Sequence, residues 1–231
     1  MGVQLLPRNF TRITSILALV AVSLLLSALP LYEPWLTYIF KPVATALILA
    51  ISLRNWRQQA SPLALWISLG LFLSLIGDIL LMLPGNLFLY GLTAFLLAHI
   101  SYLVGFARDV KFPARVSVWI LYLAIIGSFY EFLRPTIPPG LRLPVAIYVF
   151  VVTSMAAQSM GRFLILKNNA AFCAAAGTLL FVLSDSLLSF DRFRASIPWA
   201  SFFILVSYYA AQWLIALSTS AVASQTEVEV L

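Results

Sequence analysis

The chain has 231 residues, of which 62% are hydrophobic and only 10% are charged, and its mean hydropathy is +1.01. This composition excludes a soluble globular protein, because a core of this size could not bury so much apolar surface. The net charge of +6 does not indicate a nucleic-acid partner, since the basic residues stand singly between long apolar runs. We therefore expect an all-α, polytopic integral membrane protein surrounded by the lipid bilayer.

Eight apolar runs follow one another along the chain, each of about the 17 to 25 residues that a spanning helix needs. Prolines, glycines and paired asparagines fall at or beside their ends. The predicted transmembrane helices are 13–29, 36–53, 63–83, 87–107, 116–132, 143–160, 170–190 and 197–219. They form one domain over residues 13–219 with short loops, flanked by an N-terminal cytoplasmic segment, 1–12, and a polar C-terminal tail, 220–231.

The basic residues are divided unequally between the two ends of this arrangement. If the N-terminus lies inside, nine of the 14 lysines and arginines fall on the inner side. The five on the outer side are Lys41, Arg134, Arg142, Arg192 and Arg194. Because basic loops favour the cytoplasmic side, we expect both termini in the cytoplasm of a multi-pass protein of the bacterial inner (cell) membrane.

Two aspartates, Asp78 and Asp185, stand alone inside apolar segments of membrane length. A carboxylate in hydrocarbon is costly and commonly marks a working site. The pattern Gly70-x7-Asp78-x-Leu-Leu recurs as Gly177-x7-Asp185-x-Leu-Leu at an offset of 107 residues, through duplication or by chance. Each aspartate is expected about 7.5 Å below the outer boundary of its helix. We therefore predict that the two carboxyls face one another and share one proton near neutral pH.

Four further residues are candidates for positioning substrate or water. His99 and Tyr102 are three residues apart on one helix face. Side chains lean toward the N-terminus of their helix, so we expect His99 to point toward the membrane depth at which the two carboxyl groups lie. Lys41 stands near the start of the second predicted helix. It is a candidate either to neutralise a carboxylate or to bind a phosphate, and the alternative is a lysine that extends to the outer membrane interface. Ser186, beside Asp185, either positions substrate or water or acts as a packing hydroxyl.

Four strings in this order resemble the YhhN family of lysoplasmalogenases, over about residues 36 to 215. They are FKP at 40–42, IGDILLML at 76–83, GLTAFLLAHISY at 91–102 and GTLLFVLSDSLL at 177–188. The resemblance implies an integral-membrane hydrolase that uses no cofactor. It would cleave the sn-1 vinyl-ether bond of a lysoplasmalogen, or a related ether lysolipid, giving a fatty aldehyde and glycerophospho-ethanolamine or -choline.

The resemblance also assigns residues. The family's paired intramembrane aspartates correspond to Asp78 and Asp185, its histidine and tyrosine to His99 and Tyr102, and its lysine to Lys41.

The chemistry of the residues fits this reaction. A vinyl ether hydrolyses through protonation of its β-carbon, which leaves an oxocarbenium ion that water captures. One aspartate would donate the proton, while the other stabilises the cation and activates water, and the sequence does not distinguish their roles. His99 or Tyr102 would orient the water or the ether oxygen, and Lys41 would hold the head-group phosphate as a point charge.

Three other functions remain open from the sequence. A proton-coupled membrane transporter would use the buried aspartates as a proton relay. An intramembrane aspartyl protease also uses two membrane aspartates, and Gly77-Asp78 resembles part of its motif, but Leu75 stands where the motif has its other glycine. A zinc hydrolase needs two or three histidines, and this chain has one, so no metal is expected. The single cysteine, Cys173, excludes an internal disulfide and is expected to be a packing residue.

Overall fold

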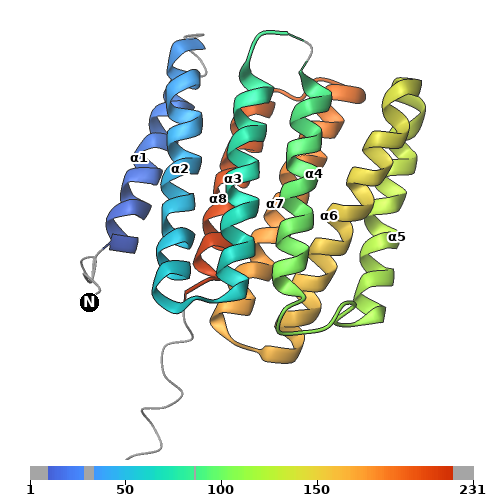
Figure 1. Ribbon diagram of the computed structural model, residues 1–231. Helices are drawn as coiled ribbons and strands as arrows, with labels where there is room; N and C mark the ends of the chain where they lie inside the picture. The colour runs from blue at the N-terminus through green and yellow to red at the C-terminus, as the bar shows by residue number, and fades with distance from the viewer. Residues whose placement is uncertain (1–9, 29–33, 86, 221–231) are drawn as a thin grey trace, which may run out of the picture.

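The computed structural model describes residues 10–28, 34–85 and 87–220, which form an up-and-down bundle of α-helices (Figure 1). The helices are α1 (Phe10–Ala28), α2 (Pro34–Gln59), α3 (Pro62–Met82), α4 (Phe88–Phe106), α5 (Val116–Leu133), α6 (Pro139–Leu166), α7 (Asn169–Phe193) and α8 (Ala200–Leu217). A 3-10 turn, Arg134–Thr136, follows α5, and the described residues contain no strand. The all-α prediction is confirmed.

Among these helices, the seven from α2 to α8 are long and apolar enough to cross a membrane, as expected of a polytopic membrane protein. In α1 the apolar stretch is shorter, over Phe10–Ser23. The start of α1 falls inside the segment predicted to precede the first span. Residues 1–9 and 221–231, which make up most of the two predicted flanking segments, lie outside the described residues. The cytoplasmic placement of the termini stays a prediction.

Local sequence explains several helix ends. Prolines stand in the first turn of α2, α3 and α6, where a missing backbone N–H does no harm. For this reason α6 begins at Pro139, four residues before the predicted start. The turn between α6 and α7 is short because Lys167 adopts a left-handed conformation, with φ 51°. Asn168 then caps α7 by accepting a 2.8 Å hydrogen bond from the backbone N–H of Ala171.

The central layers of the bundle are two closely packed hairpins, α3–α4 and α7–α8, with α1 and α2 at one side and α5 and α6 at the other (Figure 1). Two glycines allow the close approach. A Cβ at Gly70 would overlap the ring of Tyr102 on α4, and one at Gly177 would lie 2.9 Å from the carbonyl oxygen of Ala211 on α8. Small residues at such positions let membrane helices pack backbone against backbone.

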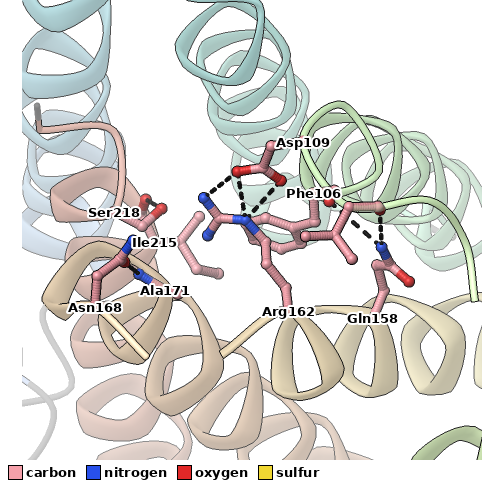
Figure 2. A network of polar contacts seen from close by, with 9 residues as sticks. Phe106, Asp109, Gln158, Arg162, Asn168, Ala171, Ile215 and Ser218 are labelled. Atoms are coloured by element: carbon pink, nitrogen blue, oxygen red, sulfur yellow. Dashed lines mark hydrogen bonds and ion pairs between the residues drawn. The ribbon is translucent and has the colours of Figure 1, made fainter. Parts of the chain in front are cut away.

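A polar cluster ties the connection between α4 and α5 to α6 (Figure 2). Arg162 donates from Nη2 to Oδ2 of Asp109 at 2.6 Å and from Nε to both carboxylate oxygens. Gln158 donates to the carbonyl of Val110 at 2.6 Å and accepts from the backbone N–H of Ala114 at 2.8 Å. Because it joins the C-terminal end of α4 to that of α6, this cluster lies at the opposite end of the bundle from the C-terminal ends of α3 and α7 (Figure 1).

Candidate active site

A cavity of about 290 Å³ lies near the C-terminal ends of α3 and α7. Each of the seven helices from α2 to α8 contributes side chains to its wall. Its walls are mostly leucine, valine, isoleucine and phenylalanine. Four of the six site residues predicted from sequence line it: Lys41, Asp78, Asp185 and Ser186. The two aspartates are therefore on the wall of one cavity, although they come from helices 107 residues apart in sequence.

The helix ends around the cavity are less symmetric than the repeated motif predicted. Asp78 lies four residues before the end of α3 at Met82. Asp185 lies eight residues before the end of α7 at Phe193, because this helix continues beyond the predicted end at residue 190. The last two turns of α7 consequently extend past Asp185.

Asp78 is held by three partners and is only 1% exposed. One carboxylate oxygen, Oδ1, lies 3.3 Å from Nζ of Lys41 on α2. The other, Oδ2, accepts hydrogen bonds of 2.7 Å from the hydroxyls of Thr45 on α2 and Tyr208 on α8. A cation and two donors on one carboxyl group all stabilise its ionised form.

Asp185 has a different environment. It is partly buried, and its Oδ2 accepts a 2.8 Å hydrogen bond from the hydroxyl of Tyr148 on α6. None of the ion pairs among the described residues includes it. Beside it, Ser186 donates back to the carbonyl of Val182 at 2.7 Å, so this hydroxyl also satisfies the helix backbone. The two carboxyl groups on the cavity wall thus differ in their stabilisation.

Tyr102 lies behind the cavity wall rather than on it. Its ring is fully buried, and its hydroxyl donates to Oε1 of Gln212 at 2.8 Å. Gln212 in turn donates to the hydroxyl of Tyr208 at 3.0 Å, and Tyr208 donates to Asp78. The residue that was predicted to contact water or substrate therefore reaches Asp78 through a chain of three hydrogen bonds.

His99 is also fully buried behind the wall, in an aromatic environment. Its ring centroid lies 4.6 Å from that of Phe181, 5.2 Å from Tyr148 and 6.2 Å from Tyr102. Neither ring nitrogen has a hydrogen-bond partner among the described residues. His99 thus packs between the tyrosine that binds Asp185 and the first tyrosine of the chain that leads to Asp78.

Three residues that contact the aspartates, Thr45, Tyr148 and Tyr208, were not among the predicted site residues, and the sequence favoured a packing or interfacial role for Tyr208. Two of them carried a signal, since Thr45 follows Lys41 by four residues and Tyr208 precedes Gln212 by four, which puts each pair on one helix face. No polar neighbour of this kind distinguishes Tyr148 from the other tyrosines. Within the described parts of the chain, no group of three or more histidine, cysteine, aspartate or glutamate side chains could hold a metal ion.

Comparison with known proteins gives a consistent family assignment. Residues 36–219 match the model of the YhhN family. The chain is 31% identical to a protein of Rattus norvegicus named lysoplasmalogenase TMEM86B, over 74% of this chain and 69% of that protein. It is 30% identical to lysoplasmalogenase TMEM86A of Bos taurus, over 90% and 81% of the two chains, and 30% identical to a lysoplasmalogenase of Mycobacterium bovis, over 65% and 58%. No solved structure matches this chain.

Proposed function

The chain belongs to the YhhN family, and from this we propose that it is a lysoplasmalogenase, a membrane-embedded hydrolase that cleaves the sn-1 vinyl-ether bond of a lysoplasmalogen or a related ether lysolipid. The observation that carries this proposal is the pair of aspartates on the wall of one apolar cavity, one paired with a lysine and the other not. Relatives named lysoplasmalogenase support the same activity.

The reaction needs a proton donor and an anion close together. In our mechanism Asp185 is protonated and transfers its proton to the β-carbon of the vinyl ether, which makes the carbon attached to the ether oxygen an oxocarbenium ion. Water adds to that carbon and loses a proton to a carboxylate, which leaves a hemiacetal. In the collapse of the hemiacetal its hydroxyl gives a proton to Asp185, while Asp78 passes the proton taken from water to the glycerol oxygen. The fatty aldehyde and the free sn-1 hydroxyl separate, and both aspartates are back in their starting protonation states. In sum, one water is consumed and one carbon–oxygen bond is cleaved.

The partners of each aspartate support this division of roles. Lys41 and two hydroxyls favour a negative charge on Asp78 against the cost of its burial, so in our mechanism Asp78 is the anion that stabilises the oxocarbenium ion and accepts the proton of water. Asp185 has one phenol and no paired cation, and it lies in mostly apolar surroundings that favour a neutral acid. Tyr102 and Gln212 act as positioning residues that orient Tyr208 on Asp78.

Aldehyde release from purified protein tests the activity. We expect cleavage of a lysoplasmalogen and none of its saturated-ether analogue. Asp78→Asn and Asp185→Asn should each lower kcat by about a hundredfold or more, as is typical when an acid or base is lost. Near-normal aldehyde release from either variant would refute the mechanism. If the wild type itself releases no aldehyde but moves protons with a solute in liposomes, the transporter alternative is the correct one.

The position of the transferred proton gives a second test. In deuterated water, protonation of the β-carbon places one deuterium on carbon 2 of the aldehyde, which mass spectrometry detects after chemical reduction to the alcohol. An aldehyde that carries no deuterium at this carbon would exclude the proposed first step.

The family and the apolar helices make this a multi-pass membrane protein. Its assignment to the bacterial inner membrane is part of the proposal and rests on the excess of basic residues on the inner side.

A further inference from the structure

One face of α7 presents polar side chains along the cavity, from its interior to its edge. Asp185, Ser189 and Arg192 all line it, at spacings of four and three residues that place them on the same side of the helix. From Asp185 to Arg192 the helix rises about 10 Å. The exposed side chain of Arg192 shows that the cavity reaches the surface at this point, so Arg192 stands at its mouth.

The guanidinium of Arg192 is positioned by aromatic rings rather than by a carboxylate. Its central carbon lies 3.7 Å from the ring centroid of Phe88, at the start of α4, and 5.9 Å from that of Phe193. None of the three ion pairs among the described residues includes Arg192. A guanidinium that lies over a ring and pairs with no carboxylate has N–H donors left over, and two of them can bind a phosphate with parallel hydrogen bonds.

The other cation on the cavity wall is less suited to this task. Lys41 already pairs with Asp78 at 3.3 Å and is 15% exposed. A phosphate bound to Lys41 would compete with the carboxylate that the reaction uses as its anion. The phosphate of a lysolipid is also separated from the sn-1 oxygen by the three glycerol carbons, so it must sit away from the aspartates, on the side of the mouth. Long arginine side chains on a helix lean toward its N-terminus, which brings Arg192 back over the cavity.

We infer that Arg192 forms a binding subsite for the head-group phosphate of the lysolipid at the mouth of the cavity, while Lys41 serves Asp78. The inference rests on the proposed function, since it places the phosphate relative to the bond that is cleaved. Ser189 lines the cavity between Asp185 and Arg192, where the glycerol segment of the lipid would pass. The subsite makes a phosphate group, rather than any particular amine on it, the recognised feature.

Binding of an uncleavable ligand tests the subsite without relying on catalysis. The probe is 1-alkyl-sn-glycero-3-phosphoethanolamine, the saturated ether, titrated into purified protein in nanodiscs, with phosphate-free 1-alkyl-sn-glycerol as the second probe. We expect Arg192→Gln to weaken binding of the phospholipid about tenfold or more, as for loss of hydrogen bonds to a charged group, and to leave binding of the alkylglycerol unchanged. Arg192→Lys, which keeps the charge, should retain part of the phospholipid affinity.

Arg194 provides the matched control. It is exposed near the end of the same helix and lies over another ring, that of Phe132 at 4.9 Å, but it does not line the cavity. Arg194→Gln should bind both probes like the wild type. Equal weakening by the two glutamine variants, or weakening of both probes by Arg192→Gln, would overturn the assignment, as would unchanged binding of the phospholipid.

Two further measurements separate the other outcomes. Inorganic phosphate alone should bind at least about a hundredfold more weakly than the lysolipid, because it cannot fill the apolar cavity, and equal affinity would mean a site for free phosphate instead. Aldehyde release from the cleavable lysoplasmalogen is measured in parallel. If the wild type binds the ether phospholipid through Arg192 but releases no aldehyde, the proposed function fails while the phosphate subsite stands.

Discussion

Replacing Lys41 with methionine removes the cation paired with Asp78 and keeps a side chain of similar length. Because Nζ lies 3.3 Å from Oδ1 and Asp78 is 1% exposed, the attraction is about 5 kcal/mol at an effective dielectric constant of about 20. The hydroxyls of Thr45 and Tyr208 remain on the other oxygen. We therefore expect Lys41→Met to lower the free energy of unfolding by about 3 kcal/mol, the lower end of the range for breaking a buried pair.

A double-mutant cycle isolates this interaction. Unfolding of the wild type, Lys41→Met, Asp78→Asn and the double variant is followed by tryptophan fluorescence as SDS is added to the protein in mixed micelles. The second substitution should cost much less in the background of the first, so the double variant should be more stable than additivity predicts by about 2 kcal/mol or more. Lys41→Met should also release aldehyde slowly, because Asp78 loses the group that keeps it ionised. Strictly additive losses, or a Lys41→Met protein as stable and active as the wild type, would refute the coupling.

Three other substitutions separate the site from its supporting structure. Tyr208→Phe removes a hydrogen-bond donor to the carboxylate of Asp78 and should lower kcat about tenfold. The control is Tyr209→Phe, which loses a bond to the backbone carbonyl of Lys41 but none to Asp78, and which should change kcat less than about twofold. Similar rates for the two variants would contradict the proposed mechanism. Gly70→Ala should destabilise the protein by about 1 to 3 kcal/mol in SDS unfolding. Gly127→Ala on α5, where an added Cβ would meet nothing within 4 Å, should be neutral or stabilising. A reversed order of stability would mean that the α3–α4 hairpin is loosely packed. Asp109→Asn should cost about 2 kcal/mol of stability, because it leaves a buried guanidinium without its carboxylate, yet leave KM unchanged; wild-type stability would show that the ion pair at this end contributes nothing.

Much of the helical layout followed from the sequence because each spanning helix is a long apolar run between proline, glycine or asparagine breakers. Where the prediction missed, the reason was local, as at Pro139, which was expected in a loop but opens α6 because proline fits the first helical turn. The shared cavity was also foreseeable, since Asp78 and Asp185 stand at similar positions in segments that repeat and run in the same direction.

The partners of the aspartates were much less predictable. Whether Tyr148 reaches Asp185, or Tyr208 reaches Asp78, depends on how α6 and α8 are rotated and spaced against α7 and α3. That rotation is set by the packing of whole helices, and the periodicity of one helix does not contain it. For the same reason the sequence could not separate His99, which lies behind the wall, from Lys41, which lies on it.

The glycines of the two hairpins have a consequence for an enzyme that works in a fluid solvent. A bilayer varies in thickness and composition, and helices that meet through long side chains can slide and tilt in response. Gly70 and Gly177 instead bring the aspartate-bearing helices α3 and α7 against α4 and α8 with no room for a Cβ. The position of each aspartate along the membrane normal is thus fixed by the contact of its helix with a neighbouring helix, so Asp78 and Asp185 keep their relative depth while the surrounding lipid changes.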